Sequence, residues 1–178
     1  MLFRPLDIPG LFLIELKRKE DEGGFFSRLF CTETFLQHGL CADYPQWSVS
    51  SNERRGTLRG LHFQAPPHEE TKLVSCTRGA VFDVAVDLRT DSPSRGRWIA
   101  VELSADNRST LYIPTGFAHG FQTLTDDAEL RYHISTRYHP EAARGVRWDD
   151  PDLAIVWPKA DERVISHRDQ TLPWLRDL

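Results

Sequence analysis

Short apolar runs separated by turn residues occupy most of the chain. Val, Phe, Leu, Trp and Thr dominate the runs, and pairs such as Gly23-Gly24, Pro66-Pro67 and Asp126-Asp127 mark the turns between them. This pattern is typical of an all-β sandwich or barrel. Because no linker or repeat interrupts it, we expect a single domain over residues 1–178. A short helix is expected over residues 33–38, with Thr32 as its N-cap and Gly39 just after its end, and a second short helix near the C-terminus.

Alternation within the runs places polar side chains on faces that otherwise look apolar. In residues 80–88, the side chains of Phe82, Val84, Val86 and Leu88 share one face, and those of Val81, Asp83, Ala85 and Asp87 share the other. Lys72 has the parity of Val74 and Cys76, and Tyr132 has the parity of Leu130. A buried lysine must be paired, so Lys72 either serves a site or extends its ammonium group to solvent from a strand end. Tyr132 either packs its ring with one hydrogen bond or reaches a site.

Two histidines lie within two residues of a glycine in apolar strands. His62 and Arg59 are three residues apart, so strict alternation puts them on opposite faces, whereas a bulge at Gly60 would bring both to one pocket. His119 lies in the segment Gly116-Phe-Ala-His-Gly-Phe121. Taken alone, each histidine is either an ordinary packed residue or a functional one. The shared parity of Gln46, Ser48 and Ser50 indicates either an exposed strand or the polar wall of a pocket.

Composition and charge narrow the function classes. Lys and Arg total 22 against 26 for Asp and Glu, a formal charge of −4, so a general nucleic-acid binder is not expected. Apolar residues make up 40% and charged residues 27% of the chain, which argues against global disorder. We see no signal peptide and no membrane span, and three cysteines without a CxxC spacing suit a cytoplasmic protein.

Two classes of catalytic site also find little support. The strand around His62 reads His-Phe-Gln rather than His-x-His, and the other histidines are scattered, so neither a metal site nor a metal-dependent cupin is expected. No Gly-x-Ser-x-Gly motif is present, and Cys76 in mid-strand is best interpreted as a small buried residue.

Five segments together resemble the dTDP-4-dehydrorhamnose 3,5-epimerase family. They are Gly56-Thr-Leu-Arg-Gly-Leu-His-Phe-Gln64, Lys72-Leu-Val74, Asp83-Val-Ala-Val-Asp-Leu-Arg89, Ile113-Pro-Thr-Gly-Phe-Ala-His-Gly-Phe121 and Trp148-Asp-Asp-Pro151. The resemblance implies a cupin-like jelly-roll β-barrel with a few short peripheral helices, usually dimeric and without metal or organic cofactor. It also implies epimerisation of a nucleotide-linked 4-keto-6-deoxyhexose in deoxysugar or dTDP-rhamnose biosynthesis.

The resemblance also implies roles for the residues that stood out. Hydrogens at C3 and C5 flank the C4 ketone and are weakly acidic, so the reaction needs a base, a stabiliser of the enolate oxygen and an acid on the opposite face. By resemblance, His62 is the base, Asp169 its carboxylate partner, Lys72 the enolate stabiliser and Tyr132 the acid. The resemblance also implies that Arg59 binds the diphosphate. It places the following residues at or near the sugar and nucleotide: His119, Gln46, Ser48, Arg168, Arg28 and Asp83.

The chain departs from the family pattern at several positions. Gly23 stands where an arginine is common, Arg28 where an acidic residue is common and Glu70 where a glutamine is common, and His133 follows the tyrosine. The four residues with proposed catalytic roles all match the family pattern, whereas the departures fall at positions expected around the substrate. A single-carbon epimerase, a ketoisomerase and a non-catalytic sugar-nucleotide-binding cupin therefore stay as alternatives, although the last predicts loss of His62, Asp169 or Lys72.

Overall fold

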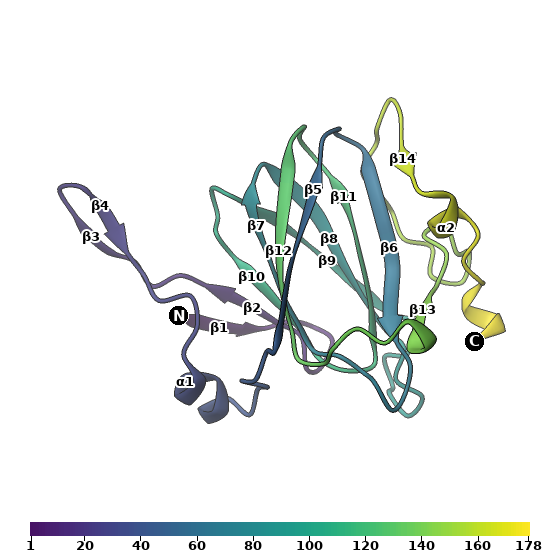
Figure 1. The fold of residues 1–178 in the computed structure, drawn as a ribbon, viewed down its shortest axis with the longest axis horizontal. Coiled ribbons are helices and arrows are strands. Elements are labelled where there is room, and N and C mark those ends of the chain that lie inside the picture. The colour runs from purple at the N-terminus through teal and green to yellow at the C-terminus, as the bar shows by residue number, and fades with distance from the viewer.

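The structure, a computed structural model, describes all residues 1–178, and β-strands dominate it (Figure 1). The strands are β1 (Leu2–Pro5), β2 (Phe12–Glu15), β3 (Lys19–Asp21), β4 (Gly24–Phe26), β5 (Gln46–Asn52), β6 (Thr57–Gln64), β7 (Lys72–Arg78), β8 (Ala80–Asp87), β9 (Trp98–Ser104), β10 (Thr110–Ile113), β11 (Phe117–Thr123), β12 (Ala128–Ile134), β13 (Ala143–Gly145) and β14 (Val164–Ile165). The helices are α1 (Thr32–Gln37) and α2 (His167–Gln170), with 3-10 turns η1 (Pro140–Ala142) and η2 (Leu175–Asp177). The expected all-β fold with short peripheral helices is confirmed.

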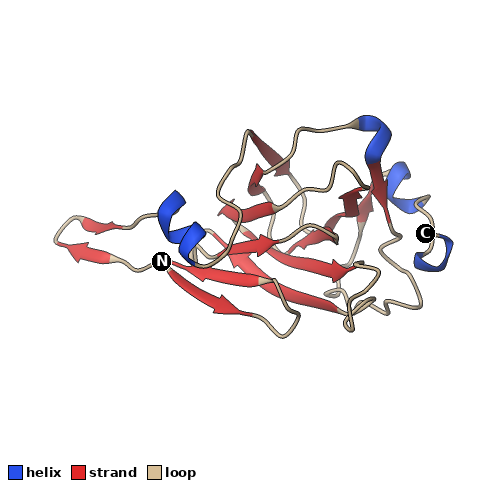
Figure 2. Cartoon of the chain, turned by 90° about the horizontal axis from the view of Figure 1, so that it is seen from below, coloured by secondary structure: helices blue, strands red, loops and turns tan.

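Two antiparallel sheets face each other across the core. One has the strand order β1-β2-β10-β7-β12-β5, and the other has the order β13-β6-β11-β8-β9, with β14 added parallel to β6. Strands β5 and β6 lie at or next to the open edges of these two sheets. The β3–β4 hairpin extends away from both sheets, and the helices lie at the ends of the strands rather than over the core (Figure 2).

The inner faces of the sheets form the main core, and the predicted parities hold there. Val74, Cys76 and Leu130 belong to this core, and Tyr132 packs against it. The alternation in β8 is also confirmed, but both of its faces are buried. Val81 and Ala85 face the inner core, whereas Val84 and Val86 pack beneath the C-terminal segment. A central strand covered on both sides accounts for the nearly continuous apolar run.

Helix α1 begins one residue earlier than the sequence pattern predicts. Cys31 is its N-cap and makes no side-chain capping bond, so the prediction of Thr32 as N-cap is wrong. Phe35, which is fully buried, anchors the helix through packing and makes a strong cap unnecessary. Gly39 has φ +68°, as expected for the residue after a helix end. None of the helices has the length and apolar character needed to cross a bilayer.

Candidate active site

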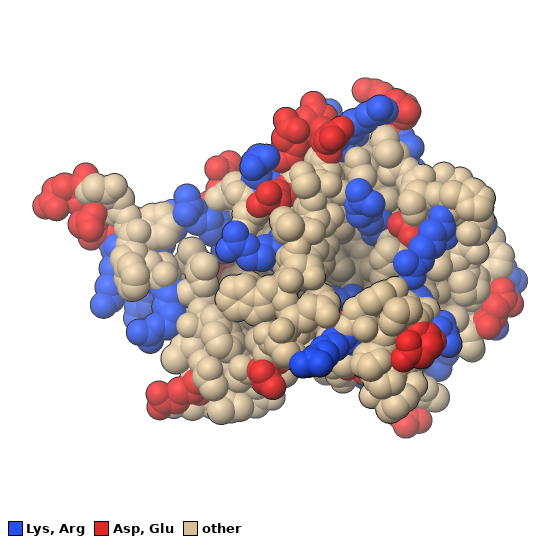
Figure 3. All heavy atoms as spheres, in the orientation of Figure 1, with Lys and Arg blue, Asp and Glu red and all other residues tan.

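A polar cavity of about 280 Å³ opens between the two sheets near β5 and β6. Figure 3 shows the hollow between these strands, with basic side chains at its rim. Its lining residues are Gln46, Ser48, Val49, Ser50, Arg59, His62, Glu70, Lys72, His119, Gly120, Phe121, Tyr132, Ile134 and Tyr138. A larger cavity of about 650 Å³ lies between the β3–β4 hairpin and the outer face of the first sheet. That cavity is mainly apolar, so the concentration of titratable groups marks the smaller one as the candidate active site.

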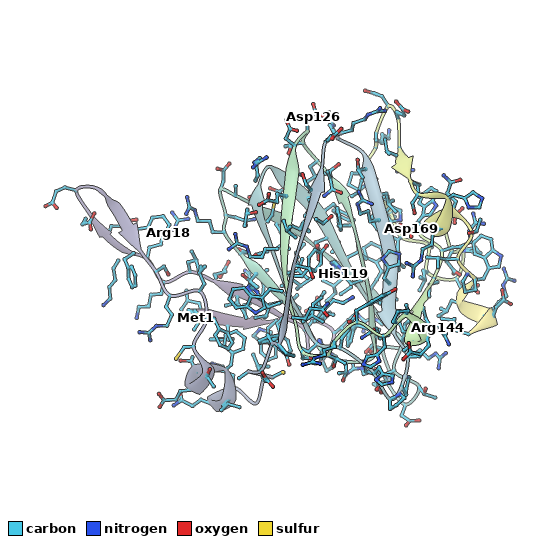
Figure 4. The ribbon with its side chains drawn as sticks, in the orientation of Figure 1. Met1, Arg18, His119, Asp126, Arg144 and Asp169 are labelled. Atoms are coloured by element: carbon cyan, nitrogen blue, oxygen red, sulfur yellow. The ribbon has the colours of Figure 1, made fainter.

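His62 and Asp169 form a hydrogen-bonded pair at one wall of the cavity. The Nε2–H group of His62 donates to Asp169 Oδ1 at 2.7 Å, and the Gly60 backbone N–H donates to Asp169 Oδ2 at 3.2 Å. Ser166 Oγ, at the N-cap of α2, accepts the backbone N–H of Asp169 and so fixes where the carboxylate points. Figure 4 shows Asp169 on α2, beside β6. Because a carboxylate only accepts hydrogen bonds, Nε2 carries a proton and the second ring nitrogen of neutral His62 is free to act as a base.

The pKa of Asp169 lies below its ordinary value. Burial by itself opposes ionisation of this carboxyl group, but the hydrogen bond and electrostatic attraction from His62 and the hydrogen bonds from Gly60 and Ser166 outweigh it, and the pKa falls. Asp169 therefore remains a carboxylate near neutral pH, which is the form that stabilises a protonated imidazole.

A bulge in β6 brings Arg59 to the same cavity as His62. The pairing of β6 with β11 shifts register between His119 and Phe121, so β6 holds one more residue than its partner at Gly60. Gly60 has φ +118°, and a Cβ atom there would lie 2.6 Å from Gly120 Cα. Only glycine fits this position, and of the two arrangements that the sequence left open for Arg59 and His62, the bulge is the one observed.

Lys72 is held in the cavity by a carboxylate that the family pattern did not suggest. Its Nζ lies 2.9 Å from Glu70 Oε1 and 3.4 Å from the carbonyl oxygen of His62. The side chains of Lys72 and Glu70 are only 9% and 11% exposed. Lys72 therefore does not extend to bulk solvent, and its ammonium group lies beside the backbone of the candidate base.

Tyr132 lies on the sheet opposite His62, next to a second histidine–aspartate pair. The rings of Tyr132 and His119 are 5.8 Å apart in a T-shaped arrangement. His119 Nε2 is 3.0 Å from both oxygens of Asp83, which is fully buried (Figure 4 labels His119). Burial raises the pKa of Tyr132 well above 10, and the negative charge of Asp83 adds to the effect. The phenol therefore stays protonated and can act as an acid.

The mouth of the cavity offers polar contacts on both sides. Arg59 Nε donates to Asn52 Oδ1 at 2.7 Å, which orients the guanidinium group. Gln46, Ser48 and Ser50 all line the cavity, so of the two interpretations that the sequence left open for β5, the structure favours the polar wall. Gln46 Oε1 also accepts the backbone N–H of Tyr138 at 3.0 Å.

Three predicted binding residues, Arg28, Arg168 and the buried Asp83, do not line the cavity, and other residues of the site were missed. Arg28 is exposed in the segment after the β3–β4 hairpin, and Arg168 is exposed on α2; neither lines the cavity of its own chain. Asn52, Glu70 and Tyr138 also belong to the site, although neither the strand pattern nor the family resemblance pointed to them. Asn52 continues the parity of Ser48 and Ser50 and could have been found from it, whereas Glu70 and Tyr138 come from loops whose placement the local pattern does not encode.

A family model described as dTDP-4-dehydrorhamnose 3,5-epimerase matches residues 5–177. The chain belongs to this epimerase family. Among curated dTDP-4-dehydrorhamnose 3,5-epimerases, it is 43% identical to that of Sinorhizobium fredii over all of this chain and 91% of the relative. It is 44% identical to that of Escherichia coli over 97% of this chain and 93% of the relative.

Solved structures of the epimerase family share the fold over the whole chain. The dTDP-4-dehydrorhamnose 3,5-epimerase of Elizabethkingia anophelis superposes with a TM-score of 0.96 at 37% identity, covering 99% of this chain and 97% of that one. An epimerase of Legionella pneumophila in complex with dTDP-4-keto-L-rhamnose gives 0.92 at 38% identity, covering 98% and 93%. A 3'-monoepimerase of Streptomyces bikiniensis in complex with dTDP-quinovose gives 0.88 at 38% identity, covering 97% and 87%. The expected cupin-like fold is confirmed.

Proposed function

We propose that this member of the epimerase family inverts C3, C5 or both in a dTDP-linked 4-keto-6-deoxyhexose through an enolate. The observation that carries the proposal is the arrangement of the cavity: the hydrogen-bonded His62–Asp169 pair and the protonated Tyr132 lie on opposite sheets, with the Lys72 ammonium group between the strands that bear them. The ligands of the relatives from Legionella pneumophila and Streptomyces bikiniensis support the dTDP-sugar as the substrate class.

The proposed chemistry moves one proton off the sugar and one back on. The free ring nitrogen of His62 takes the proton from the carbon next to the ketone, and the electron pair of that C–H bond forms the enolate. Lys72 stabilises the developing negative charge on the C4 oxygen, an effect worth about 3–4 kcal/mol for one well-placed donor in comparable sites. The Tyr132 phenol then protonates the same carbon from the opposite face, which inverts it. Solvent restores the phenol proton and removes the imidazolium proton.

The two shifted pKa values favour this division of roles. The lowered pKa of Asp169 keeps a negative charge against the imidazolium that forms when His62 accepts a proton. The raised pKa of Tyr132 keeps the acid in its protonated form. Environments that separate two titratable groups in this way are typical of acid–base pairs in enzymes.

The rim supports the binding of a nucleotide diphosphate. The guanidinium group of Arg59 can donate paired hydrogen bonds to phosphate oxygens, and its hydrogen bond to Asn52 fixes its orientation. His119, Gln46 and Ser48 are proposed to contact the sugar or base, and Asp83 to orient His119. Arg168 and Arg28 are proposed to approach the nucleotide only once ligand or a second chain is present, since they lie outside the cavity.

Proton exchange in D2O tests the proposal directly. The purified protein is incubated with dTDP-4-keto-6-deoxyglucose, and proton NMR follows the C3 and C5 signals. We expect deuterium at one or both carbons and no exchange with His62→Asn. Absence of exchange in the wild-type protein, with a control epimerase active on the same substrate, would remove the proposal.

A single inversion is the second candidate function. The solved 3'-monoepimerase shares the fold of this chain, and Glu70, which departs from the family pattern, pairs directly with Lys72. The same spectra distinguish the two, because exchange at C3 alone indicates a monoepimerase and exchange at both carbons indicates a double epimerase. Exchange followed by movement of the ketone would indicate a ketoisomerase.

A homodimer is part of the proposal. The apolar cavity at the β3–β4 hairpin lies next to large apolar side chains that are exposed in one chain, among them Phe26 at 70% and Trp47 at 69%. A second copy would cover this surface, which a monomer rarely leaves exposed. Sedimentation measures the mass, and Trp47→Glu should shift it from dimer to monomer.

The three free cysteines suit the cytoplasm, where we place the enzyme.

A further inference from the structure

We propose that His68, His139 and Glu141 form a binding site for one divalent transition-metal ion, outside the catalytic cavity. The rings of His68 and His139 stack with centroids 3.6 Å apart and planes 15° from parallel. His139 Nδ1 lies 3.1 Å from Glu141 Oε1. Each of the three residues offers a ligand atom within 4.8 Å of the others. The two histidines are far apart in the sequence, which explains why their spacing gave no sign of a site.

The backbone that carries these side chains is fixed by a buried glutamine. Gln64 is only 4% exposed, and its side-chain oxygen accepts the backbone N–H of His139 at 2.6 Å. Its side-chain amide donates to the carbonyl oxygens of His68 at 3.0 Å and Arg137 at 3.2 Å. One side chain at the end of β6 therefore clamps both loops. The 3-10 turn η1 begins directly after His139 and presents Glu141 on the same side.

The donor set selects the kind of metal. Two imidazoles and one carboxylate form the ligand set typical of Zn²⁺ and its neighbours, whereas Mg²⁺ and Ca²⁺ prefer oxygen ligands alone. The site is open to solvent, because the Glu141 side chain is 68% exposed and that of His139 35% exposed. Water can therefore complete the coordination. The imidazole rings must rotate out of their stack to direct both lone pairs at one ion, and partly exposed side chains permit that rotation.

The position of the site gives the metal a structural role. His68 lies two residues before Glu70, and His139 directly follows Tyr138; Glu70 and Tyr138 both line the catalytic cavity. A bound ion would join the two loops that form this side of the cavity mouth. It would stabilise the folded chain by mass action without taking part in the proton transfers.

Zinc titration of the metal-stripped full chain tests the proposal. Calorimetry with ZnCl2 should give one ion per chain, and a hundredfold excess over Kd should raise the Tm by about 5–10 °C. His68→Asn and Glu141→Gln should each weaken binding by at least about tenfold. His167→Asn, at an exposed histidine of α2 outside the cluster, is the matched control and should bind as the wild type does.

Three results would overturn the metal site. The first is no zinc binding by the wild type, and the second is zinc binding that both His68→Asn and Glu141→Gln retain. The third is an equal loss of zinc affinity in the control His167→Asn. If His68→Asn fails to fold, Glu141→Gln decides alone, because its side chain is exposed and its isosteric change leaves packing intact. None of these readouts depends on epimerase activity.

Discussion

Replacing Asp169 by asparagine removes the charge behind the candidate base while keeping its shape. The carboxylate accepts from His62 Nε2 and from the Gly60 backbone N–H. In Asp169→Asn the single amide oxygen can keep only one of these bonds. If it stays with Gly60, the amide NH2 faces Nε2 and forces the ring proton onto the nitrogen that must accept the substrate proton. The variant therefore loses both the charge and the tautomer that the base requires.

The size of the effect follows from the geometry. A hydrogen bond to a charged group contributes about 1.5–3 kcal/mol, which corresponds to roughly 10–150-fold in rate when it forms in the transition state. The wrong tautomer adds to this loss, up to the 10²–10⁴-fold or so that a general base contributes in total. We therefore expect kcat to fall by about 10²–10⁴-fold with little change in KM.

Deuterium exchange at C3 and C5 of dTDP-4-keto-6-deoxyglucose measures the loss. The matched control is Asp149→Asn, which breaks an ion pair with Arg147 away from the cavity and should leave the exchange rate unchanged. An Asp169→Asn variant that is folded and exchanges within about threefold of the wild type would refute the role of the carboxylate, because a charge-assisted bond is worth more than that.

The same variant carries a pH signature in stability. The folded-state pKa of Asp169 is lowered, so its carboxylate stabilises the native state above the unfolded value of about 3.9, and the contribution is lost as the pH falls through the folded value. Urea unfolding should therefore show the wild type more stable than Asp169→Asn at pH 7. The gap should narrow at pH 3. A gap that is equal at both pH values would contradict the ionised pair.

Three further variants test the rest of the site. Tyr132→Phe should still exchange substrate protons through His62 but should form inverted product about 10²–10⁴-fold more slowly. NMR measures exchange and product in one sample, and an equal loss of exchange and product formation would contradict the acid role. Glu70→Gln removes a negative charge from the cavity that Arg59 also lines, and should tighten dTDP binding by about 2–10-fold at low salt, as calorimetry against Glu129→Gln at a remote ion pair will show. Unchanged affinity would count against diphosphate binding in this cavity. Gly60→Ala puts a Cβ atom on a residue with positive φ and pushes it against Gly120. Urea unfolding should show the free energy of unfolding lowered by about 2–4 kcal/mol, and a loss under about 1 kcal/mol would show that the bulge relaxes.

Local patterns in the sequence determined the strands and the faces of their side chains, whereas the proposed roles of His62, Lys72, Tyr132 and Asp169 came from the family resemblance. Period-two alternation identified the strands and put Lys72 and Tyr132 on the inner face, because side-chain direction in a strand depends only on parity. Gly60 marked a place where a bulge could form, and the structure decided in its favour, with a backbone geometry that only glycine fits. The cap of α1 was predicted one residue off, since the packing of Phe35 outweighed capping preference.

Only the tertiary structure decided which groups meet. Asp169 reaches His62 because α2 packs beside β6, Glu70 reaches Lys72 through a loop, and His68 stacks on His139 because Gln64 ties their backbones together. Arg28 and Arg168 lie outside the cavity for the same kind of reason, since hairpin and helix placement is set by long-range packing. A sequence encodes the direction of a side chain within its own strand, whereas the distance between two loops depends on every contact that closes the fold.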